Sequence, residues 1–287
     1  MNFIAVLPTL LVVALALVMF GLGLSLVVDD FRRLLNHRKA VVVALLLQVL
    51  VLPLACYALV VALQVPPVFA IGLLLLAASP GGVTANLFSH LFGGNVAMNI
   101  SLTAINTVLS IVTLPLIANL AIAAFANGGQ VVPLQFAKVA EVMAVVLVPV
   151  ALGMVVRQKS PAFSQRMDGP MKLFSALVLA AITVLAIAKE WDALVRSFAT
   201  IGTAVIAFNL ISLLAGYGVP RAAGLDKPLA TAIGFEIGIH NSTLAIFIAL
   251  SVLQNFELAL PAAVYSVVMY VTATLFGLLV LRPRRRQ

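Results

Sequence analysis

Nine long apolar runs, separated by short segments with charged or turn-forming residues, make up almost the whole sequence. Each run is close to the ~20 residues that an α-helix needs to cross the hydrocarbon core of a membrane. Hydrophobic residues make up 63% of the chain and charged residues only 9%, whereas about a quarter of the residues in a soluble domain are charged. We therefore predict an all-α polytopic membrane protein with nine transmembrane helices. The runs cover residues 3–27, 39–63, 68–91, 95–125, 134–157, 170–188, 193–218, 228–251 and 259–281.

The lysines and arginines predict how these helices are oriented. In an alternating arrangement four basic groups fall on one side of the membrane, and only Lys138, Lys189 and Arg196 fall on the other. The basic side is cytoplasmic in helical membrane proteins, so we expect a plasma-membrane protein with the N-terminus outside and the C-terminus in the cytoplasm. The groups are Arg32, Arg33, Arg38 and Lys39; Arg157, Lys159, Arg166 and Lys172; Arg221 and Lys227; and Arg282, Arg284, Arg285 and Arg286.

Other features of the composition exclude several classes of protein. The net charge of +8 is explained by the membrane topology, and without a recognition motif it does not indicate a nucleic-acid partner. Cys56 is the single cysteine, so the chain has no internal disulfide and no cysteine metal cluster. Residues 1–20 lack the basic segment that opens a signal peptide, so we expect the first run to be kept as a membrane helix.

Two of the runs contain helix-breaking residues deep in the membrane. Within the run 68–91, residues 79–86 include one proline and two glycines, which remove a backbone donor and weaken the helix. Within the run 228–251, residues 234–242 combine two glycines with several polar side chains. Because these runs are five apart, they cross in opposite directions, which is the pattern of a secondary transporter's binding site. The simpler alternative is a kink in a packed membrane helix.

Polar side chains that could bind a cation lie in and around these two segments. Asn99, Thr103 and Asn106 share one helix face, although such residues can also simply join helices by hydrogen bonds. Glu236 is the acidic residue deep in a run, where an ionisable group is costly and a functional role is expected. One carboxylate among neutral oxygen donors suits a monovalent cation such as sodium. The candidates are Gln48, Asn86, Asn99, Thr103, Asn106, Glu236, His240, Asn241 and Ser242.

These motifs resemble the bile acid:sodium symporter family, and the likeness extends over nearly the whole chain. It rests on Ser79-Pro80-Gly81-Gly82 followed by Asn86, on Gly94-Asn95-Val96-Ala97, and on Glu236-Ile237-Gly238-Ile239-His240-Asn241-Ser242-Thr243-Leu244-Ala245. The resemblance implies inverted repeats with two broken crossing helices, arranged as a core domain that moves against a panel domain. The first helix of the ten-helix bacterial members would be missing here. The panel would comprise residues 1–30 and 134–190, and the core residues 39–125 and 193–281.

The resemblance also implies a function and a set of site residues. It implies symport of one or two sodium ions with a small organic anion, which would be bile-acid-like, pantoate or a small oxo acid, and we expect a monomer in the lipid bilayer. One sodium site would be formed by Asn86, Asn99, Thr103 and Glu236, and a second by Gln48, Glu236, His240 and the backbone oxygens of Ile237 and Ile239. The substrate would face Asn241, with Val83, Thr84 and Tyr270 as further candidates.

Two positions depart from the family pattern. Ala85 stands where bacterial relatives often have a hydroxyl, and His240 stands where glutamine is usual. A neutral imidazole offers a nitrogen lone pair, whereas sodium prefers oxygen. One hypothesis is that a proton on His240, beside Glu236, replaces the second sodium ion in a proton-coupled organic anion carrier. The alternative is that neutral His240 replaces the amide in a hydrogen-bond network.

Three other classes can be weighed against a carrier. Glu236 and His240, four residues apart on one helix face, could serve an intramembrane enzyme, but no third His, Cys or Asp joins them at a break. An exporter similar to the arsenite exporters would need a reactive cysteine in a core helix, and Cys56 lies at neither break. A channel usually has repeated polar stripes or rings, whereas this sequence has one polar cluster.

Overall fold

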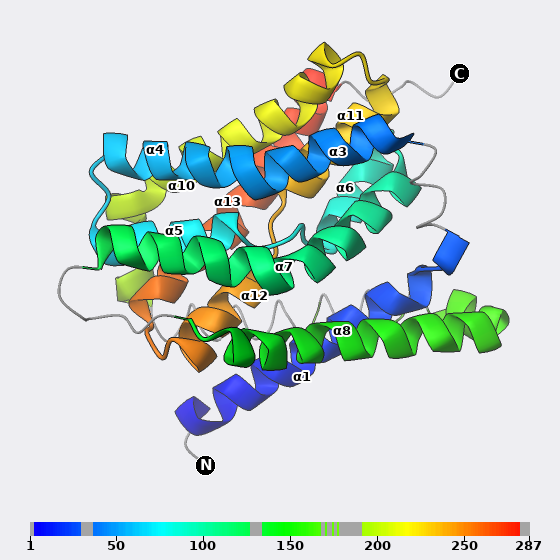
Figure 1. The fold of residues 1–287 in the computed structure, drawn as a ribbon, viewed down its shortest axis with the longest axis horizontal. Coiled ribbons are helices and arrows are strands. Elements are labelled where there is room, and N and C mark those ends of the chain that lie inside the picture. Colours follow the sequence, from blue (N-terminus) through cyan, green and yellow to red (C-terminus); the bar gives the residue numbers. More distant parts are fainter. Residues whose placement is uncertain are drawn as a thin grey trace.

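The computed structural model describes residues 3–29, 37–126, 134–167 and 191–281, with the single positions 170, 174 and 177. The described part is helical, joined by turns and short extended connections (Figure 1). The helices and helical turns are α1 (Phe3–Ser25), α3 (Arg38–Leu46), η2 (Leu47–Val51), α4 (Leu52–Ala62), α5 (Pro67–Ala77), α6 (Thr84–Leu91), α7 (Val96–Phe125), α8 (Phe136–Lys159), α10 (Trp191–Ala222), α11 (Lys227–Gly238), α12 (Ser242–Phe247), η3 (Ile248–Val252), η4 (Glu257–Ala259), α13 (Leu260–Phe276) and η5 (Gly277–Leu281).

This arrangement confirms the predicted all-α membrane protein. Within the described residues, four helices are long and apolar enough to cross a membrane, namely 38–62, 96–125, 198–222 and 257–281. The predicted runs 68–91 and 228–251 are each divided into two shorter helices, α5 with α6 and α11 with α12. The runs 3–27 and 134–157 correspond to α1 and α8. Almost all of the predicted span 170–188 lies outside the described residues, so the predicted number of nine spans stays a prediction.

Helices α1 and α8 form a close pair below the other helices in Figure 1. Their backbones meet at two glycines: a Cβ atom added at Gly153 would lie 2.8 Å from the carbonyl carbon of Gly23. Small residues permit such close crossings of membrane helices, where packing replaces the hydrophobic effect. This pair belongs to the segments that we expected to form the panel, whose remaining residues 168–190 lie largely outside the described part.

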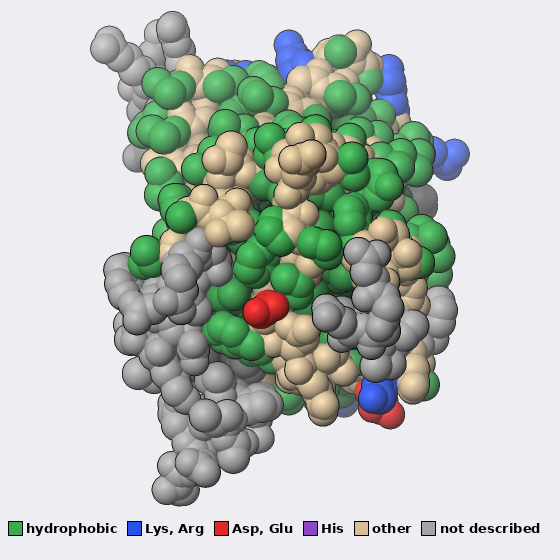
Figure 2. Space-filling view, turned by 90° about the vertical axis from the view of Figure 1, so that its left-hand side faces the viewer, with side chains coloured by type: hydrophobic (Ala, Val, Ile, Leu, Met, Phe, Trp, Pro, Cys, Tyr) green, Lys and Arg blue, Asp and Glu red, His purple; other side chains and the backbone are tan. Residues whose placement is uncertain are grey.

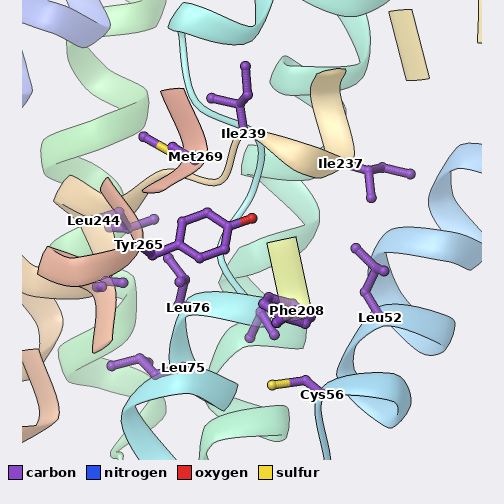
Figure 3. Packing of buried hydrophobic residues seen from close by; sticks show 14 of the residues in the cluster. Leu52, Cys56, Leu75, Leu76, Phe208, Ile237, Ile239, Leu244, Tyr265 and Met269 are labelled. Carbon is purple, nitrogen blue, oxygen red and sulfur yellow. The ribbon is translucent and has the colours of Figure 1, made fainter. Parts of the chain in front are cut away.

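The buried apolar core surrounds the two broken helices. Figure 3 shows side chains from α4, α5, α10 and α13 converging there, including Leu52, Leu76, Phe208 and Tyr265. All four of these side chains are almost completely buried. Polar groups placed among them must find partners within the protein, because hydrocarbon and lipid supply none.

The outer surface is apolar, and the charged residues lie toward its ends. Exposed leucines such as Leu54, Leu120 and Leu279 are typical of a lipid-facing surface. Figure 2 looks onto the left-hand end of the bundle in Figure 1, where an acidic side chain lies among hydrophobic and other side chains. In Figure 1 the start of α3, the end of α8 and the junction of α10 with α11 lie toward the right-hand end of the bundle. These segments contain basic residues from three of the four predicted groups, so the structure places those residues at one end.

Candidate functional site

The two broken helices cross at their interruptions. The extended segment 78–83 follows α5, the segment 239–241 follows α11, and Gly81 pairs with His240 in an antiparallel bridge. The Gly82 N–H donates to the Ile239 carbonyl at 2.6 Å, and the Asn241 N–H donates to the Pro80 carbonyl at 2.8 Å. The predicted pair of interrupted helices is therefore confirmed, and the two interruptions satisfy part of each other's backbone hydrogen bonding.

Local sequence explains why α5 stops here. Pro80 has no N–H, so it cannot donate to the Leu76 carbonyl as a helical residue would. The Ser79 backbone N–H and hydroxyl donate to that carbonyl instead, at 2.9 Å and 2.7 Å. Gly81 then allows a close approach, because a Cβ atom there would overlap the Glu236 carboxylate. The proline and glycines therefore make room for the one acidic side chain of the crossover.

Glu236 is completely buried in the last turn of α11. The Thr103 hydroxyl donates to Oε2 at 2.5 Å, Asn106 Nδ2 donates to Oε1 at 3.1 Å, and the Gly81 backbone N–H also donates to the carboxylate. All of these donors are uncharged. A buried carboxylate held by neutral donors is costly unless a cation or a proton compensates it, so this geometry indicates a cation or proton site.

Several buried amide side chains have oxygen atoms with no hydrogen-bond partner in the described part of the chain. Asn99 Nδ2 donates to the Ala232 carbonyl at 2.6 Å, and Gln48 Nε2 donates to the Ser79 and Ala77 carbonyls at 3.0 Å and 3.3 Å. The protein therefore binds the N–H ends of these amides. Within the described residues, the buried amide oxygens without a hydrogen-bond partner are those of Gln48, Asn86, Asn99 and Asn106. Unpartnered buried oxygens beside a carboxylate are the donors that a hard cation needs.

Two backbone carbonyls were also predicted as ligands. The Ile237 carbonyl has lost its helical donor, because the Asn241 N–H bonds to Pro80 instead. The Ile239 carbonyl already accepts the Gly82 N–H, which leaves one of its two lone pairs. Of the two carbonyls, that of Ile237 therefore has more unused hydrogen-bonding capacity for a cation.

His240 is fixed by stacking and by one polar contact. Its ring lies parallel to Phe208, with centroids 5.5 Å apart and 6° between the planes, and packs against Tyr265 at 5.5 Å. Nδ1 lies 3.4 Å from the Ser79 carbonyl, which can only accept, so in a neutral ring we assign the hydrogen to Nδ1. Nε2 is buried with no partner in the described part of the chain. His240 thus presents a nitrogen lone pair, and not an oxygen, at the crossover.

The predicted substrate residues lie at two places. The Thr84 hydroxyl, in the first turn of α6, donates to the Tyr270 hydroxyl at 3.4 Å. The Tyr270 ring is 40% exposed and stacks on Phe88, while Val83 packs against the core at the start of α6. Asn241 lies at the other break, where its oxygen accepts the Leu244 N–H at 3.0 Å and caps α12. Two of the four predicted substrate residues, Thr84 and Tyr270, therefore lie in hydrogen-bond contact.

Sequence analysis missed a buried polar network on α10 and α13. Asn209 Nδ2 donates to the Gly238 carbonyl and to the Tyr265 hydroxyl, both at 2.7 Å, and Tyr265 donates to the same carbonyl at 2.9 Å. The Thr272 hydroxyl donates to Asn209 Oδ1. Asn209 is a strongly polar residue within the apolar run 193–218, which is the same signal that identified Gln48 in the run 39–63.

Comparison with known proteins agrees with this geometry. A family model described as the sodium bile acid symporter family matches residues 12–197. The chain is 29% identical over 254 residues to the uncharacterized sodium-dependent transporter YocS of Bacillus subtilis (strain 168), which covers 88% of this chain and 77% of that protein. It is 31% identical over 264 residues to the probable sodium/metabolite cotransporter BASS1, chloroplastic, of Arabidopsis thaliana, covering 91% of this chain and 64% of that protein.

A third relative comes from an animal. The chain is 28% identical over 243 residues to the ileal sodium/bile acid cotransporter of Cricetulus griseus, which covers 83% of this chain and 68% of that protein. These relatives are named as transporters, and the chain is accordingly a membrane transporter and not an enzyme. Because the family match extends over more than half of its length, the chain belongs to the sodium bile acid symporter family.

Proposed function

We propose that this protein is a sodium-coupled symporter that moves a small organic anion by alternating access. The observation that carries the proposal is the buried Glu236 carboxylate together with the buried amide oxygens of Gln48, Asn86, Asn99 and Asn106, which have no hydrogen-bond partner within the described residues. The protein binds the N–H ends of Asn99, Asn106 and Gln48, so the oxygens of these three amides are left for a cation. A single carboxylate among neutral oxygens would balance one positive charge better than two. The relatives include proteins named as a sodium-dependent transporter and a sodium/bile acid cotransporter, which supports sodium as that cation.

The proposed sodium ligands form two groups that share Glu236, so that one or two ions would bind. The first group consists of Asn86, Asn99, Thr103 and Glu236. The second consists of Gln48, His240, Glu236 and the carbonyls of Ile237 and Ile239. In both groups each residue contributes one neutral oxygen or nitrogen, apart from the carboxylate. Both ions would therefore depend on the same negative charge.

The anion would bind at the crossover, next to the cations. Helices α6 and α12 both begin there, at Thr84 and Ser242, and the N–H groups in a first helical turn favour negative charge. We propose that Asn241, Val83, Thr84 and Tyr270 contact the substrate. Tyr270 is large and partly exposed at the edge of this region, which favours a small anion such as pantoate or an oxo acid over a bulky bile acid.

Coupling follows if sodium and the anion both favour the same conformation. Each ligand then raises the other's affinity by the same factor. We propose that the core, residues 39–125 and 193–281, moves against the panel, residues 1–30 and 134–190, to expose the site on alternate sides. The basic residues support a cytoplasmic C-terminus and an outside N-terminus, in a monomer at the plasma membrane.

A thermal-stability screen of the purified protein tests this function. Sodium chloride and potassium chloride would be compared at equal ionic strength, alone and with a panel of small carboxylates, steroid sulfates and bile acids. A ligand that binds the folded state raises its apparent stability. We expect stabilisation by sodium but not potassium, and a further increase with one class of anion only when sodium is present. Equal stabilisation by both salts, with no anion effect, would contradict the proposal.

A further inference from the structure

The last turn of α11 has two carbonyls that have lost their helical donors. In a continuous helix Ile237 and Gly238 would accept the N–H groups of Asn241 and Ser242. The Asn241 N–H instead donates to Pro80 at 2.8 Å, and the Ser242 N–H donates to the His240 carbonyl at 2.9 Å. Both carbonyls are buried within an apolar core, where an unsatisfied group is costly.

The structure treats these two carbonyls differently. Gly238 accepts two replacement hydrogen bonds, from Asn209 Nδ2 at 2.7 Å and from the Tyr265 hydroxyl at 2.9 Å. In the described part of the chain, no side chain donates in the same way to Ile237. The network therefore holds the Gly238 carbonyl toward α10 and α13, while the neighbouring Ile237 carbonyl is left for another partner.

Asn209 and Tyr265 are completely buried in this network, and Thr272 is partly buried. Asn209 uses both hydrogens of its amide, one for Gly238 and one for the Tyr265 hydroxyl, and its oxygen accepts the Thr272 hydroxyl. The Tyr265 ring also packs on the His240 ring, with centroids 5.5 Å apart. Figure 3 shows this ring surrounded by apolar side chains, with its hydroxyl directed away from Leu244. One side chain thus contacts both a backbone group and a side chain at the end of α11.

We infer that Asn209 and Tyr265 are positioning residues for the second cation group. Glycine has more backbone freedom than any other residue, so Gly238 alone would not fix the orientation of the peptide that follows Ile237. The two hydrogen bonds supply that constraint and keep the Ile237 carbonyl directed toward the cation, while the Tyr265 ring holds His240 in place. The inference rests on the proposed function, because it assumes that a cation binds there.

Sodium titrations of purified variants test this inference. The variant Tyr265→Phe keeps the ring on His240 and removes only the hydroxyl, whereas Asn209→Ala removes the hydrogen bonds of Asn209 to Gly238, Tyr265 and Thr272 and leaves the one from Tyr265 to Gly238. Stability is measured as sodium replaces potassium at constant ionic strength. We expect the sodium concentration for half-maximal stabilisation to rise about fivefold in Tyr265→Phe, the order expected from one net hydrogen bond, and further in Asn209→Ala. The melting temperature of Tyr265→Phe in potassium alone should fall, because one buried N–H of Asn209 loses its partner, and the sodium midpoint is measured relative to that baseline.

Thr274→Val is the matched control, because Thr274 lies on the same helix and its hydroxyl bonds only to the local Tyr270 carbonyl, at 2.7 Å. We expect its sodium midpoint to equal that of the wild type. A wild-type midpoint in Tyr265→Phe would overturn the inference, as would an equal shift in the control. If Asn209→Ala does not fold, the sodium midpoint of Tyr265→Phe alone tests the inference. A wild-type protein that does not respond to sodium would overturn the proposed function, and this inference with it.

Discussion

The two segments of the crossover share a backbone arrangement but differ in chemistry. Each ends a half-helix, and each receives hydrogen bonds from a buried amide on the helix that precedes it in its half of the chain. Gln48 donates to the Ala77 and Ser79 carbonyls after α5, and Asn209 donates to the Gly238 carbonyl at the end of α11. In both segments a buried side-chain amide thus donates to backbone carbonyls that have no helical donor.

The difference between them lies in size and charge. The segment after α5 has Pro80, Gly81 and Gly82, which contribute space and backbone groups but no charge. The segment at the end of α11 has Glu236 and His240, both completely buried. A Cβ atom at Gly81 would overlap the Glu236 carboxylate. The segment after α5 therefore needs a glycine at this position to leave space for the Glu236 side chain. The comparison indicates that the break at the end of α11 contributes the negative charge and that the break after α5 provides the space for it.

Removing the charge should have the largest effect. Glu236→Gln keeps the volume of the side chain and removes the negative charge that both proposed cation groups share. We expect sodium-dependent stabilisation and concentrative anion uptake to fall to background. In potassium alone the variant should be at least as stable as the wild type, because an uncompensated buried carboxylate is costly. Normal uptake by this variant in proteoliposomes would show that Glu236 is not the cation ligand.

Filling the space at Gly81, in the segment after α5, should have the second-largest effect. Gly81→Ala would push against the Glu236 carboxylate and should weaken sodium binding at least tenfold, with a stability loss of about 1–3 kcal/mol from overpacking. Gly82→Ala is the matched control, because its Cβ would lie 3.1 Å from the His240 carbonyl oxygen and needs only a small shift. The measurement is the sodium titration of thermal stability. Equal midpoints for the two variants would argue against the fit between Gly81 and Glu236.

The sequence predicted much of this fold and part of the site. Apolar length identified the spans that are described, because a membrane allows few alternatives to a helix of about 20 residues. Pro80 and the charge of Glu236 located the two breaks directly. Sequence could not predict which carbonyl each amide binds, because Gln48 and Asn209 reach groups 31 and 29 residues away. Asn209 was not predicted, although it is a strongly polar residue in an apolar run, as Gln48 is.

Substitution of Gln48 tests whether the two proposed cation groups bind separate sodium ions. Gln48→Leu removes an unpartnered oxygen of the second group and leaves the Asn99 and Thr103 contacts in place. If two ions bind, we expect the Hill coefficient for sodium-dependent uptake to fall from about 2 toward about 1. Asn119→Leu is a suitable control, because the Asn119 amide only ties the Leu134 backbone, at 2.9 Å and 2.7 Å. An unchanged Hill coefficient in Gln48→Leu would place Gln48 outside the cation site.

Changing His240 should have a smaller effect. His240→Gln replaces the nitrogen lone pair by an amide oxygen, and sodium prefers oxygen. We expect the sodium midpoint to fall by a few-fold, with uptake still dependent on sodium. Uptake would be measured against sodium and proton gradients separately. Proton-driven uptake by the wild type that is lost in this variant would favour the proton-coupled alternative.

The smallest expected effect concerns the substrate. Tyr270→Phe removes the long hydrogen bond with Thr84, at 3.4 Å, and keeps the stacking on Phe88. We expect the anion's half-saturating concentration to change about two- to fivefold, in line with one weak hydrogen bond, while the sodium titration without anion stays unchanged. A changed sodium midpoint would mean that Tyr270 acts on the cation site rather than on the anion.

Direct binding of radioactive sodium to the purified protein tests the central claim most directly. The account predicts saturable binding to the wild type that excess sodium displaces and equal potassium does not. It predicts no saturable binding to Glu236→Gln, whose fold is checked by its melting temperature in potassium. Saturable sodium binding to Glu236→Gln at wild-type affinity, or none to the wild type, would contradict the claim that the crossover is a sodium site built on Glu236.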